Sequence, residues 1–227
     1  MSRLSFHIAA ALFSVLIASG CSRNYRMDGN VELYGFDGEQ LYLVTHENDV
    51  FTVVDSCCVR HGHFSMKGKA DSTVFAVLCH GFEPVLPLFI ERGRMQVRIA
   101  PTDLQVKGTR LNDQLYEFLE RKNDIDNRYE DILQRSSYFT NRVNPSVSYD
   151  DSLKSVVSEA EDYIFGFVRK HYTDPLGVCV FMMMCDGMAM REPTPLIRRI
   201  LDNAPAKFLG NRSISNYVSS VGYKVSD

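Results

Sequence analysis

The spacing of apolar residues changes near Gly108, and this change constrains the fold of the chain more than any other feature. Before Gly108, Met95, Val97 and Ile99 alternate with polar residues, a period of two that is typical of a β-strand with one solvated face. After Gly108, apolar residues follow the three-and-four spacing of an amphipathic helix. The apolar residues of this first helical stripe are Leu111, Leu115, Phe118, Leu119, Ile125, Tyr129, Ile132 and Leu133. The sequence therefore predicts an α+β protein.

The first part, residues 21–108, is predicted to be an antiparallel β domain. Turn-forming residues recur through it at roughly the spacing of 8–12 residues that all-β domains show. These turn signals are Asp28-Gly29, Asp37-Gly38, Asn48-Asp49, His61-Gly62, Gly81 and Arg92-Gly93. Short strands with such turns favour a sandwich or a barrel, and the alternation predicts that one face of the strands is solvated.

The second part, residues 109–227, is predicted to be a helical subdomain. Its first helix begins near Thr109 or Asn112, which are residues that can cap a helix, and a polar break covers 136–149. The later helices are expected to start at Asp150 or Asp151, after Asp174 with Pro175 in the first turn, at Thr194-Pro195, and at Ser213. The helix after Asp174, which is expected to reach about Ala189, is apolar nearly all round and should therefore be buried.

Residues 1–20 have the three regions of a signal peptide and are excluded from the fold. A single charge, Arg3, precedes an apolar run of about eleven residues, which is too short to span a bilayer. Small residues, Ala18 to Gly20, then precede Cys21, and this pattern resembles the lipobox of bacterial lipoproteins. The resemblance implies a lipid on Cys21, a membrane anchor and a place in the cell envelope. No acidic cluster follows Cys21, which favours the periplasmic face. The alternatives are a secretory signal with an unmodified Cys21 and a permanent membrane anchor.

Composition restricts the class of protein. With 45% apolar and 23% charged residues the chain is typical of a globular protein, and its formal net charge of −3 argues against a nucleic-acid partner. No phosphate loop, serine elbow, dinucleotide fingerprint, zinc-protease motif or calcium loop occurs in the sequence. No cofactor and no catalytic residue are therefore predicted.

Five cysteines follow Cys21. Cys57 and Cys58 are adjacent, so in a strand their side chains point to opposite faces, and one of them is a candidate for a disulfide with Cys79 on a neighbouring strand. Unbridged thiols in the core or at the surface are the favoured interpretation, and the disulfide is the alternative. Cys179 and Cys185 are six residues apart, about 9 Å along a helix, which is too far for a disulfide and favours two small buried apolar side chains.

Three further groups have a structural interpretation beside a functional one. His61, His63, Cys79 and His80 contain metal-ligand types, but turn histidines explain them better than a zinc or copper site does. Glu91 before a turn favours a structural role over that of a catalytic carboxylate. The methionines from Met182 to Met190 favour a plastic core over a contact surface.

Short motifs of the β part resemble an uncharacterised N-terminal domain, a domain of unknown function, of bacterial thiol–disulfide interchange lipoproteins. The motifs are Tyr34-Gly35, Leu41-Tyr42-Leu43, Val54-Asp55-Ser56, the run from His61 to Gly68, Phe89 to Gly93, and Val106 to Thr109 with Asn112. Two later stretches, Tyr172 to Gly177 and Ile200 to Phe208 with Asn211, resemble the helical segment that follows this domain in the family.

In that family a thioredoxin-like domain often comes next, and this sequence lacks its Cys-x-x-Cys motif. The resemblance therefore implies no redox active site. We expect a membrane-anchored lipoprotein that is a non-catalytic binding or scaffold module with an envelope protein as a candidate partner. The alternative is an accessory protein for periplasmic thiol redox that acts with a thioredoxin-like partner. An enzyme that uses the histidines and cysteines with a metal is the least favoured hypothesis.

Overall fold

The computed structural model describes residues 24–47, 50–140, 149–186 and 192–224. They form two compact units that divide between Thr109 and Arg110, and each unit is described by itself. Residues 1–20 and Cys21, which carry the predicted signal peptide and lipid site, lie outside the described residues. The α+β fold class predicted from the change of period is confirmed.

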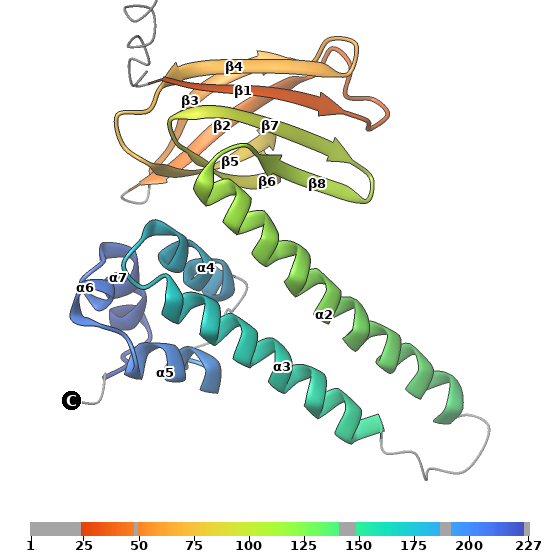
Figure 1. The fold of residues 1–227 in the computed structure, drawn as a ribbon, viewed down its shortest axis with the longest axis vertical. Coiled ribbons are helices and arrows are strands. Elements are labelled where there is room, and N and C mark those ends of the chain that lie inside the picture. Colours follow the sequence, from red (N-terminus) through yellow and green to blue (C-terminus); the bar gives the residue numbers. More distant parts are fainter. Residues whose placement is uncertain (1–23, 48–49, 141–148, 187–191, 225–227) are drawn as a thin grey trace, which may run out of the picture. The chain divides into compact units, whose positions relative to one another are not determined.

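The first unit is a sandwich of two four-stranded sheets (Figure 1). One sheet has the strand order β4-β1-β7-β8 and the other β3-β2-β5-β6. The strands are β1 (Asn24–Val31), β2 (Gln40–Glu47), β3 (Val50–Cys58), β4 (His63–Lys69), β5 (Val74–His80), β6 (Glu83–Ile90), β7 (Gly93–Ala100) and β8 (Asp103–Lys107). Both sheets are open, so of the two predicted architectures the sandwich is the one formed. The pairing is antiparallel as predicted, except that β1 and β7 run parallel.

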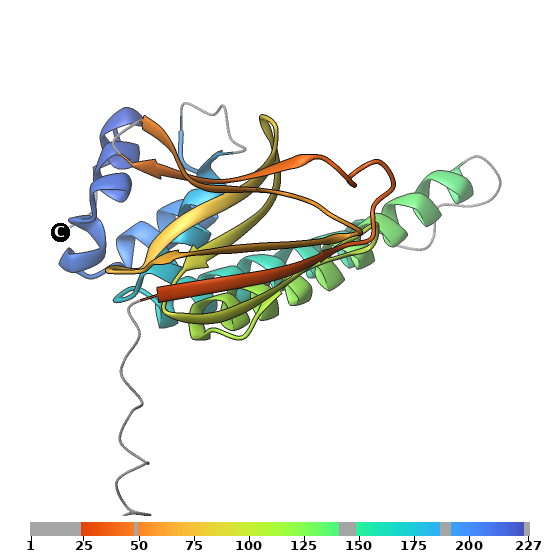
Figure 2. The same ribbon diagram turned by 90° about the horizontal axis from the view of Figure 1, so that it is seen from above.

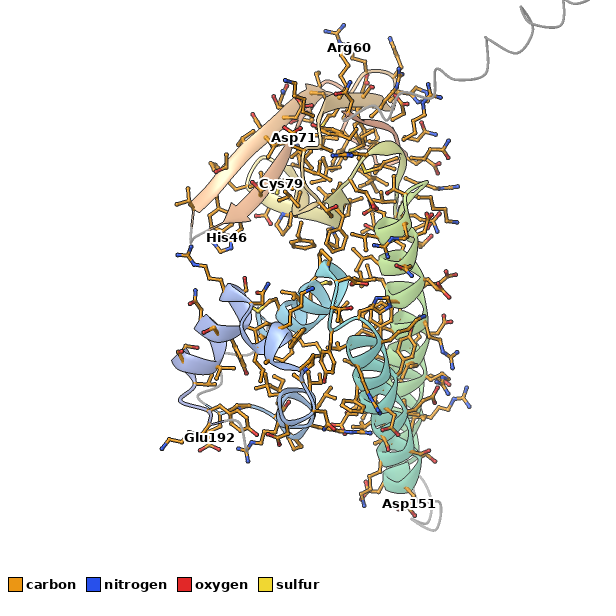
Figure 3. All side chains as sticks on the ribbon, turned by 60° about the vertical axis from the view of Figure 1, so that its left-hand side comes forward. His46, Arg60, Asp71, Cys79, Asp151 and Glu192 are labelled. Carbon is orange, nitrogen blue, oxygen red and sulfur yellow. The ribbon has the colours of Figure 1, made fainter. Side chains whose placement is uncertain are left out.

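Alternating side chains of both sheets form the core of the sandwich, and Figure 3 shows how densely side chains fill it. Met27 of β1 and Met95 of β7 are fully buried on one sheet, as are Leu43 of β2 and Leu78 of β5 on the other. The buried positions recur with the period of two that the sequence shows. Burial of such side chains is the main driving force for folding of this unit.

Two glycines in the sheet are covered by aromatic rings of the neighbouring strand. Gly29 of β1 is paired with Phe64 of β4, and a Cβ atom at Gly29 would lie 2.1 Å from the Phe64 ring. Gly68 of β4 is paired with Tyr25 of β1 in the same way, at 2.7 Å. Each glycine therefore makes room for a buried ring. The turn predicted at Asp28-Gly29 is wrong because β1 continues through both residues.

The turn predicted at His61-Gly62 is confirmed. Both residues have positive φ, 52° for His61 and 73° for Gly62, and the backbone N–H of His61 donates to the Asp37 carboxylate. Positive φ is tolerated best by glycine, so Gly62 fits the position that the chain reversal requires. The Asn48-Asp49 turn signal lies outside the described residues.

The two edges of the β3-β2-β5-β6 sheet differ in their side chains. The edge strand β6 contains Pro84 and Pro87, which lack the N–H group that strand pairing needs. The edge strand β3 has no proline and exposes four large apolar residues. These are Val50, Phe51, Val53 and Val54. An exposed apolar edge without proline or lysine is a site where strands of other chains can pair.

The second unit is all-helical. Its helices are α2 (Arg110–Thr140), α3 (Tyr149–Lys170), α4 (Pro175–Asp186), α5 (Pro195–Asp202), α6 (Ala206–Leu209) and α7 (Arg212–Ser220). The long helices α2 and α3 run side by side (Figures 1 and 2), and Phe118 of α2 packs on Tyr163 and Phe167 of α3. α2 extends beyond the break predicted at residue 136, and the short helix α6 is not predicted by the sequence.

The starts predicted for α4 and α5 are confirmed, and the residue before each helix caps it. Asp174 accepts the backbone N–H of Leu176 at 2.9 Å, and Thr194 accepts that of Ile197 at 3.3 Å. Each bond satisfies an N–H group that has no partner inside the helix. None of the helices in the described ranges is both long and apolar enough to cross a membrane.

Candidate functional site

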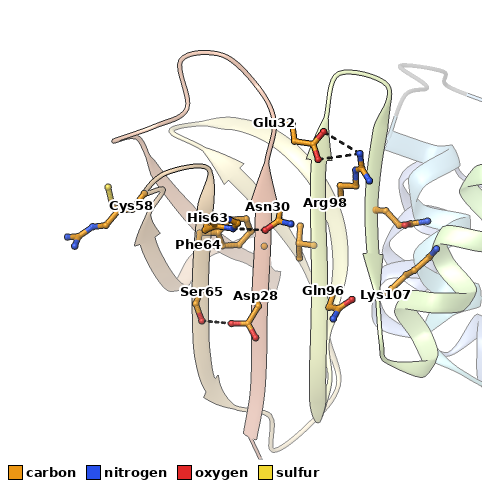
Figure 4. A pocket seen from close by; sticks show the side chains of 14 residues that line it. Asp28, Asn30, Glu32, Cys58, His63, Phe64, Ser65, Gln96, Arg98 and Lys107 are labelled. Atoms are coloured by element: carbon orange, nitrogen blue, oxygen red, sulfur yellow. Dashed lines mark hydrogen bonds and ion pairs between the residues drawn. The ribbon is translucent and has the colours of Figure 1, made fainter.

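A polar groove of about 740 Å³ lies on the outer face of the β4-β1-β7-β8 sheet (Figure 4). Its floor is the sheet itself, because buried residues such as Phe64 and Val97 point away from it into the core. Polar side chains from all four strands and two adjoining loops line it. They are Asp28, Asn30, Glu32, Arg60, His63, Ser65, Gln96, Arg98, Gln105 and Lys107, with Cys58 at one margin.

The strand register arranges these side chains in two rows across the sheet. Paired residues of neighbouring strands share a face, so pairing of Ser65, Asp28, Gln96 and Lys107 gives the first row. The second row, formed in the same way, runs His63, Asn30, Arg98 and Gln105. Residues that are far apart in sequence thereby become immediate neighbours.

Several groove side chains are hydrogen-bonded to one another. Asp28 accepts hydrogen bonds from Ser65 Oγ at 2.9 Å and from Arg26 Nε at 2.8 Å. His63 Nδ1 lies 2.7 Å from Asn30 Oδ1. Because an amide oxygen only accepts, this contact assigns the proton to His63 Nδ1. These contacts fix the positions of the side chains over β1 and β4.

Arg98 bridges the far end of the groove. Its guanidinium lies 3.2 Å from a carboxylate oxygen of Glu32 and 3.2 Å from one of Asp103. The two carboxylates hold the guanidinium plane by charge-assisted hydrogen bonds. All three side chains are about half exposed, so this network orients Arg98 and adds little to stability.

Three groove side chains make no hydrogen bond or ion pair within the described parts of the chain: Gln96, Gln105 and Lys107. They lie next to one another on β7 and β8, where Gln96 is paired with Lys107. Together they offer two amides and one ammonium group to a ligand. This side of the groove is open to binding, whereas the β1 and β4 side is already hydrogen-bonded.

The charge state of the groove is set by its neighbours. The hydrogen bond from Arg26 lowers the pKa of Asp28, and Ser65 and the charge of Arg94 act in the same direction, against a smaller effect of burial. Asp28 is therefore an ionised acceptor at neutral pH and a weak base. A carboxylate stabilised in this way is suited to fixing positions and poorly suited to taking a proton from a substrate.

The cysteines of the β unit lie away from one another. Cys57 and Cys58 are on β3 and Cys79 is on β5, and the sheet order places β2 between these strands. Two strand spacings amount to about 9.6 Å, beyond the limit of about 7 Å between the Cα atoms of a disulfide. The expectation that Cys79 lies on a strand neighbouring the Cys57-Cys58 pair is wrong, and the structure contains no bond between them.

Burial keeps two of these thiols protonated. It raises the pKa of Cys57 from about 9 to about 11, with the nearby Asp55 carboxylate adding to the effect. Burial also raises the pKa of Cys79. Because the thiolate is the nucleophile in thiol exchange, both side chains are poor attacking groups at neutral pH.

The structure does not bring the histidines and Cys79 together. His61 is in the turn before β4 and His63 is in the groove, whereas Cys79 and His80 belong to the other sheet. Figure 3 labels Cys79 and also Arg60, the residue that precedes His61 in the chain. His80 Nε2 lies 3.1 Å from a carboxylate oxygen of Glu39. Within the part of the chain that the structure describes, no three metal-ligating side chains are grouped.

The remaining candidates also lie outside the groove. Glu91 is in the turn between β6 and β7. Cys179 and Cys185 are buried on α4 and are not joined by a disulfide. Met182 and Met184 of the same helix are half-buried, and Met183 is 36% exposed, which fits a position at the margin of the helical core. Met188 and Met190 lie outside the described residues.

Sequence reasoning missed one buried polar residue, His171. It follows α3, its Nδ1 lies 2.9 Å from Asp174 Oδ2, and its Nε2 has no hydrogen-bond partner among the residues that the structure describes. The same Asp174 caps α4 through its other oxygen. The signal for this arrangement is the His-x-x-Asp-Pro spacing at the start of α4. The pair is structural, because it lies within the helical unit and joins the end of α3 to the start of α4.

Comparison with known proteins identifies the β unit. Residues 25–115 match the model of a family described as a domain of unknown function (DUF4369). The match includes the strands of both sheets from Tyr25 onward and the beginning of α2. A search of curated proteins finds no match to the chain. The uncharacterised domain expected from the short motifs is therefore present.

Proposed function

We propose that the protein is a lipid-anchored lipoprotein of the cell envelope whose β unit is a non-catalytic binding module. In this proposal Cys21 carries the anchor, and the polar groove of the β4-β1-β7-β8 sheet is the recognition surface. An envelope component with hydrogen-bonding groups is the ligand. The sequence pattern before Cys21 supports the anchor, and the geometry of the groove supports the recognition surface.

The observation that supports a binding role most directly is the group of three side chains without partners on β7 and β8. Gln96, Gln105 and Lys107 project side by side from the sheet and have no side-chain partner within the described ranges. Exposed amides and an ammonium group in fixed positions suit a ligand that presents carbonyl, hydroxyl or carboxylate oxygens. Recognition surfaces on regular strands hold their geometry better than those on loops.

The chemistry of the groove favours binding over catalysis. The Ser65 hydroxyl donates a hydrogen bond to Asp28. Because Arg26 lowers the pKa of Asp28, this carboxylate is too weak a base to activate the hydroxyl. His63 is held by an amide rather than by a carboxylate. A nucleophile, a base and an orienting group are not assembled by the side chains that line this groove.

The anchor is tested by metabolic labelling with palmitate. We expect the wild-type chain to incorporate label and Cys21→Ala to lose it. Cys79→Ala is the matched control and should label as the wild type does, since it removes a cysteine that lies outside the groove and that the proposal does not involve. Label on the Cys21→Ala protein would refute a lipid on this residue.

The groove is tested by affinity capture of envelope components on three forms of the protein. The first is the wild type, the second is Gln96→Ala with Lys107→Ala, and the third is the control Gln134→Ala with Lys154→Ala on the helical unit. We expect one component to be retained by the wild type and the control, and its retention to fall about tenfold or more with the groove variant. Equal retention by all three forms would contradict the proposal.

The alternative function is an accessory role in periplasmic thiol redox beside a thioredoxin-like partner. The raised pKa values of Cys57 and Cys79 argue against it, because exchange needs a thiolate. Trapping of mixed disulfides in the wild type separates the two functions. A specific mixed disulfide would favour the redox role over the binding role.

A further inference from the structure

The two sheets of the sandwich carry opposite charge. The strands of the β4-β1-β7-β8 sheet contain six basic and two acidic residues, a formal charge of +4. Those of the β3-β2-β5-β6 sheet contain three acidic residues and no lysine or arginine, a formal charge of −3. The whole chain has a formal net charge of only −3. Among the strands of the β unit, lysine and arginine therefore occur on the β4-β1-β7-β8 sheet alone.

The basic residues cluster at the end of this sheet where β1 begins. Lys69 is paired with Asn24, and Lys67 and Arg94 are both paired with Arg26. Since paired residues share a face and all these side chains are exposed, they form one patch on the outer face of the sheet. We call Arg26, Lys67, Lys69 and Arg94 the basic patch.

Three members of the basic patch have no hydrogen-bonded partner among the described residues, although the charge of Arg94 also acts on Asp28. Arg26 is hydrogen-bonded to Asp28, but the side chains of Lys67, Lys69 and Arg94 form no ion pair or hydrogen bond with the residues that the structure describes. Three unpaired cations within one corner of a sheet attract an anionic surface. Lys107, paired with Gln96 at the next row, extends the positive potential toward the groove.

The basic patch is close in the chain to the proposed anchor. Cys21 precedes Asn24 by three residues, and three residues of chain span at most about 11 Å. That length is close to the distance of about 8–10 Å over which charges act through physiological salt. A lipid on Cys21 would therefore hold this end of the sheet where headgroup charges reach it.

We propose that the basic patch docks on the anionic lipid headgroups of the membrane to which the protein is anchored. This inference rests on the proposed function for the position of the anchor, but the charge of the patch exists without it. A cluster of cations adds an electrostatic attraction to anionic lipids beside the hydrophobic attachment of a lipid anchor. Docking through this end of the sheet holds the start of β1 at the membrane surface.

The experiment uses the chain from residue 21 with Cys21→Ser, so that no acyl chain contributes. Binding is measured by co-sedimentation with vesicles of phosphatidylcholine alone and with vesicles in which about one third is phosphatidylglycerol. We expect binding to the anionic vesicles only, and weaker binding as salt is raised. Equal binding to both vesicles, or to neither, would overturn the proposal.

Lys67→Gln, Lys69→Gln and Arg94→Gln together should lower the partition coefficient on anionic vesicles about 100-fold, since each cation near a membrane contributes about fivefold. The matched control is Lys154→Gln, Arg169→Gln and Lys170→Gln, which removes the same number of lysines and arginines from exposed positions of α3. The control should bind nearly as the wild type does. An equal loss in the control would show that net charge alone acts and would overturn the role of the patch.

Failure of this docking and failure of the anchor are distinguishable. Palmitate labelling reports on Cys21 and does not depend on the basic patch, whereas vesicle binding of the Cys21→Ser protein depends on the patch alone. A labelled protein that ignores anionic vesicles refutes the docking and leaves the anchor. An unlabelled protein that binds them refutes the anchor and leaves a basic membrane-binding surface.

Discussion

Gly29 shows how the absence of one methyl group shapes the sheet that carries the groove. Its position in β1 is filled by the ring of Phe64, which comes from a strand more than thirty residues later. Phe64 is only 5% exposed, so the ring has no free direction in which to move. A side chain at position 29 should therefore overpack the core around Phe64.

We therefore predict that Gly29→Ala lowers the free energy of unfolding by about 1–3 kcal/mol. The added Cβ would lie 2.1 Å from a ring carbon of Phe64, which requires the ring or the strand to shift. Urea unfolding followed by circular dichroism measures the change.

Gly166→Ala is the matched control, because this glycine lies in α3 with open space around its Cβ position. It should raise the free energy of unfolding by about 0.5–1 kcal/mol, since alanine restricts the unfolded chain and favours helix. A Gly29→Ala protein as stable as the wild type would show that the ring yields freely.

The residue scale also shows what the sequence can and cannot predict. The helix starts at Asp174-Pro175 and Thr194-Pro195 are predicted correctly because their signal is local: each cap bonds to a backbone group two or three residues away. Gly29 is misinterpreted as a turn because the residue that requires a glycine there, Phe64, lies on another strand. The outward positions of Gln96 and Arg98 follow from alternation, but their neighbours across β1 and β8 do not.

Among the elements, the edge strand β3 is the least protected. Phe51 is 76% exposed on it, and the strand has neither proline nor lysine. By contrast the edge strand β4 carries Lys67 and Lys69. Charges on an edge strand hinder pairing with other chains, so β3 is the edge expected to self-associate.

Phe51→Lys should therefore reduce light scattering of concentrated protein under native conditions. The change also removes a stacked contact with His46, whose ring centroid is 4.5 Å away, so we expect a loss of stability below about 1 kcal/mol. Phe82→Lys is the control, because Phe82 is fully exposed in the turn between β5 and β6 and lies on no strand edge. If both variants lower scattering equally, general surface polarity is responsible and not the β3 edge.

At the scale of elements, local periodicity predicts strands and helices well, whereas their partners depend on tertiary packing. The stripe of α2 is apparent in the sequence, but its last turns are polar and are read as a break. The parallel pairing of β1 with β7 joins segments about seventy residues apart and has no local signal. The groove exists only because of this pairing, so the sequence could predict its residues as solvated but could not assemble them.

The whole molecule consists of two units with separate cores. A chain of this kind is expected to lose its structure in more than one step. Residues 25–115, less than half of the 227 residues, match the model of an uncharacterised family domain. The two units should therefore respond separately to a local change.

Hydrogen exchange in increasing urea tests this independence. We predict that Gly29→Ala shifts the protection of amides in β1 and β4 to lower urea while amides in α3 and α4 keep their wild-type midpoint. Gly166→Ala should have the reverse pattern, with a shift confined to the helices. Equal shifts of strands and helices in either variant would show a single cooperative unit.

The prolines of β6 limit the size of an assembly that forms by pairing of β3 edges. Open polymerisation of a sheet requires two adhesive edges on each subunit, one to accept a neighbour and one to offer to the next. Pro84 and Pro87 deprive the β6 edge of N–H groups, so the β3-β2-β5-β6 sheet has a single adhesive edge. Two copies that pair through β3 use both available edges at once, and the assembly closes as a twofold dimer whose sheet cannot grow into a fibre.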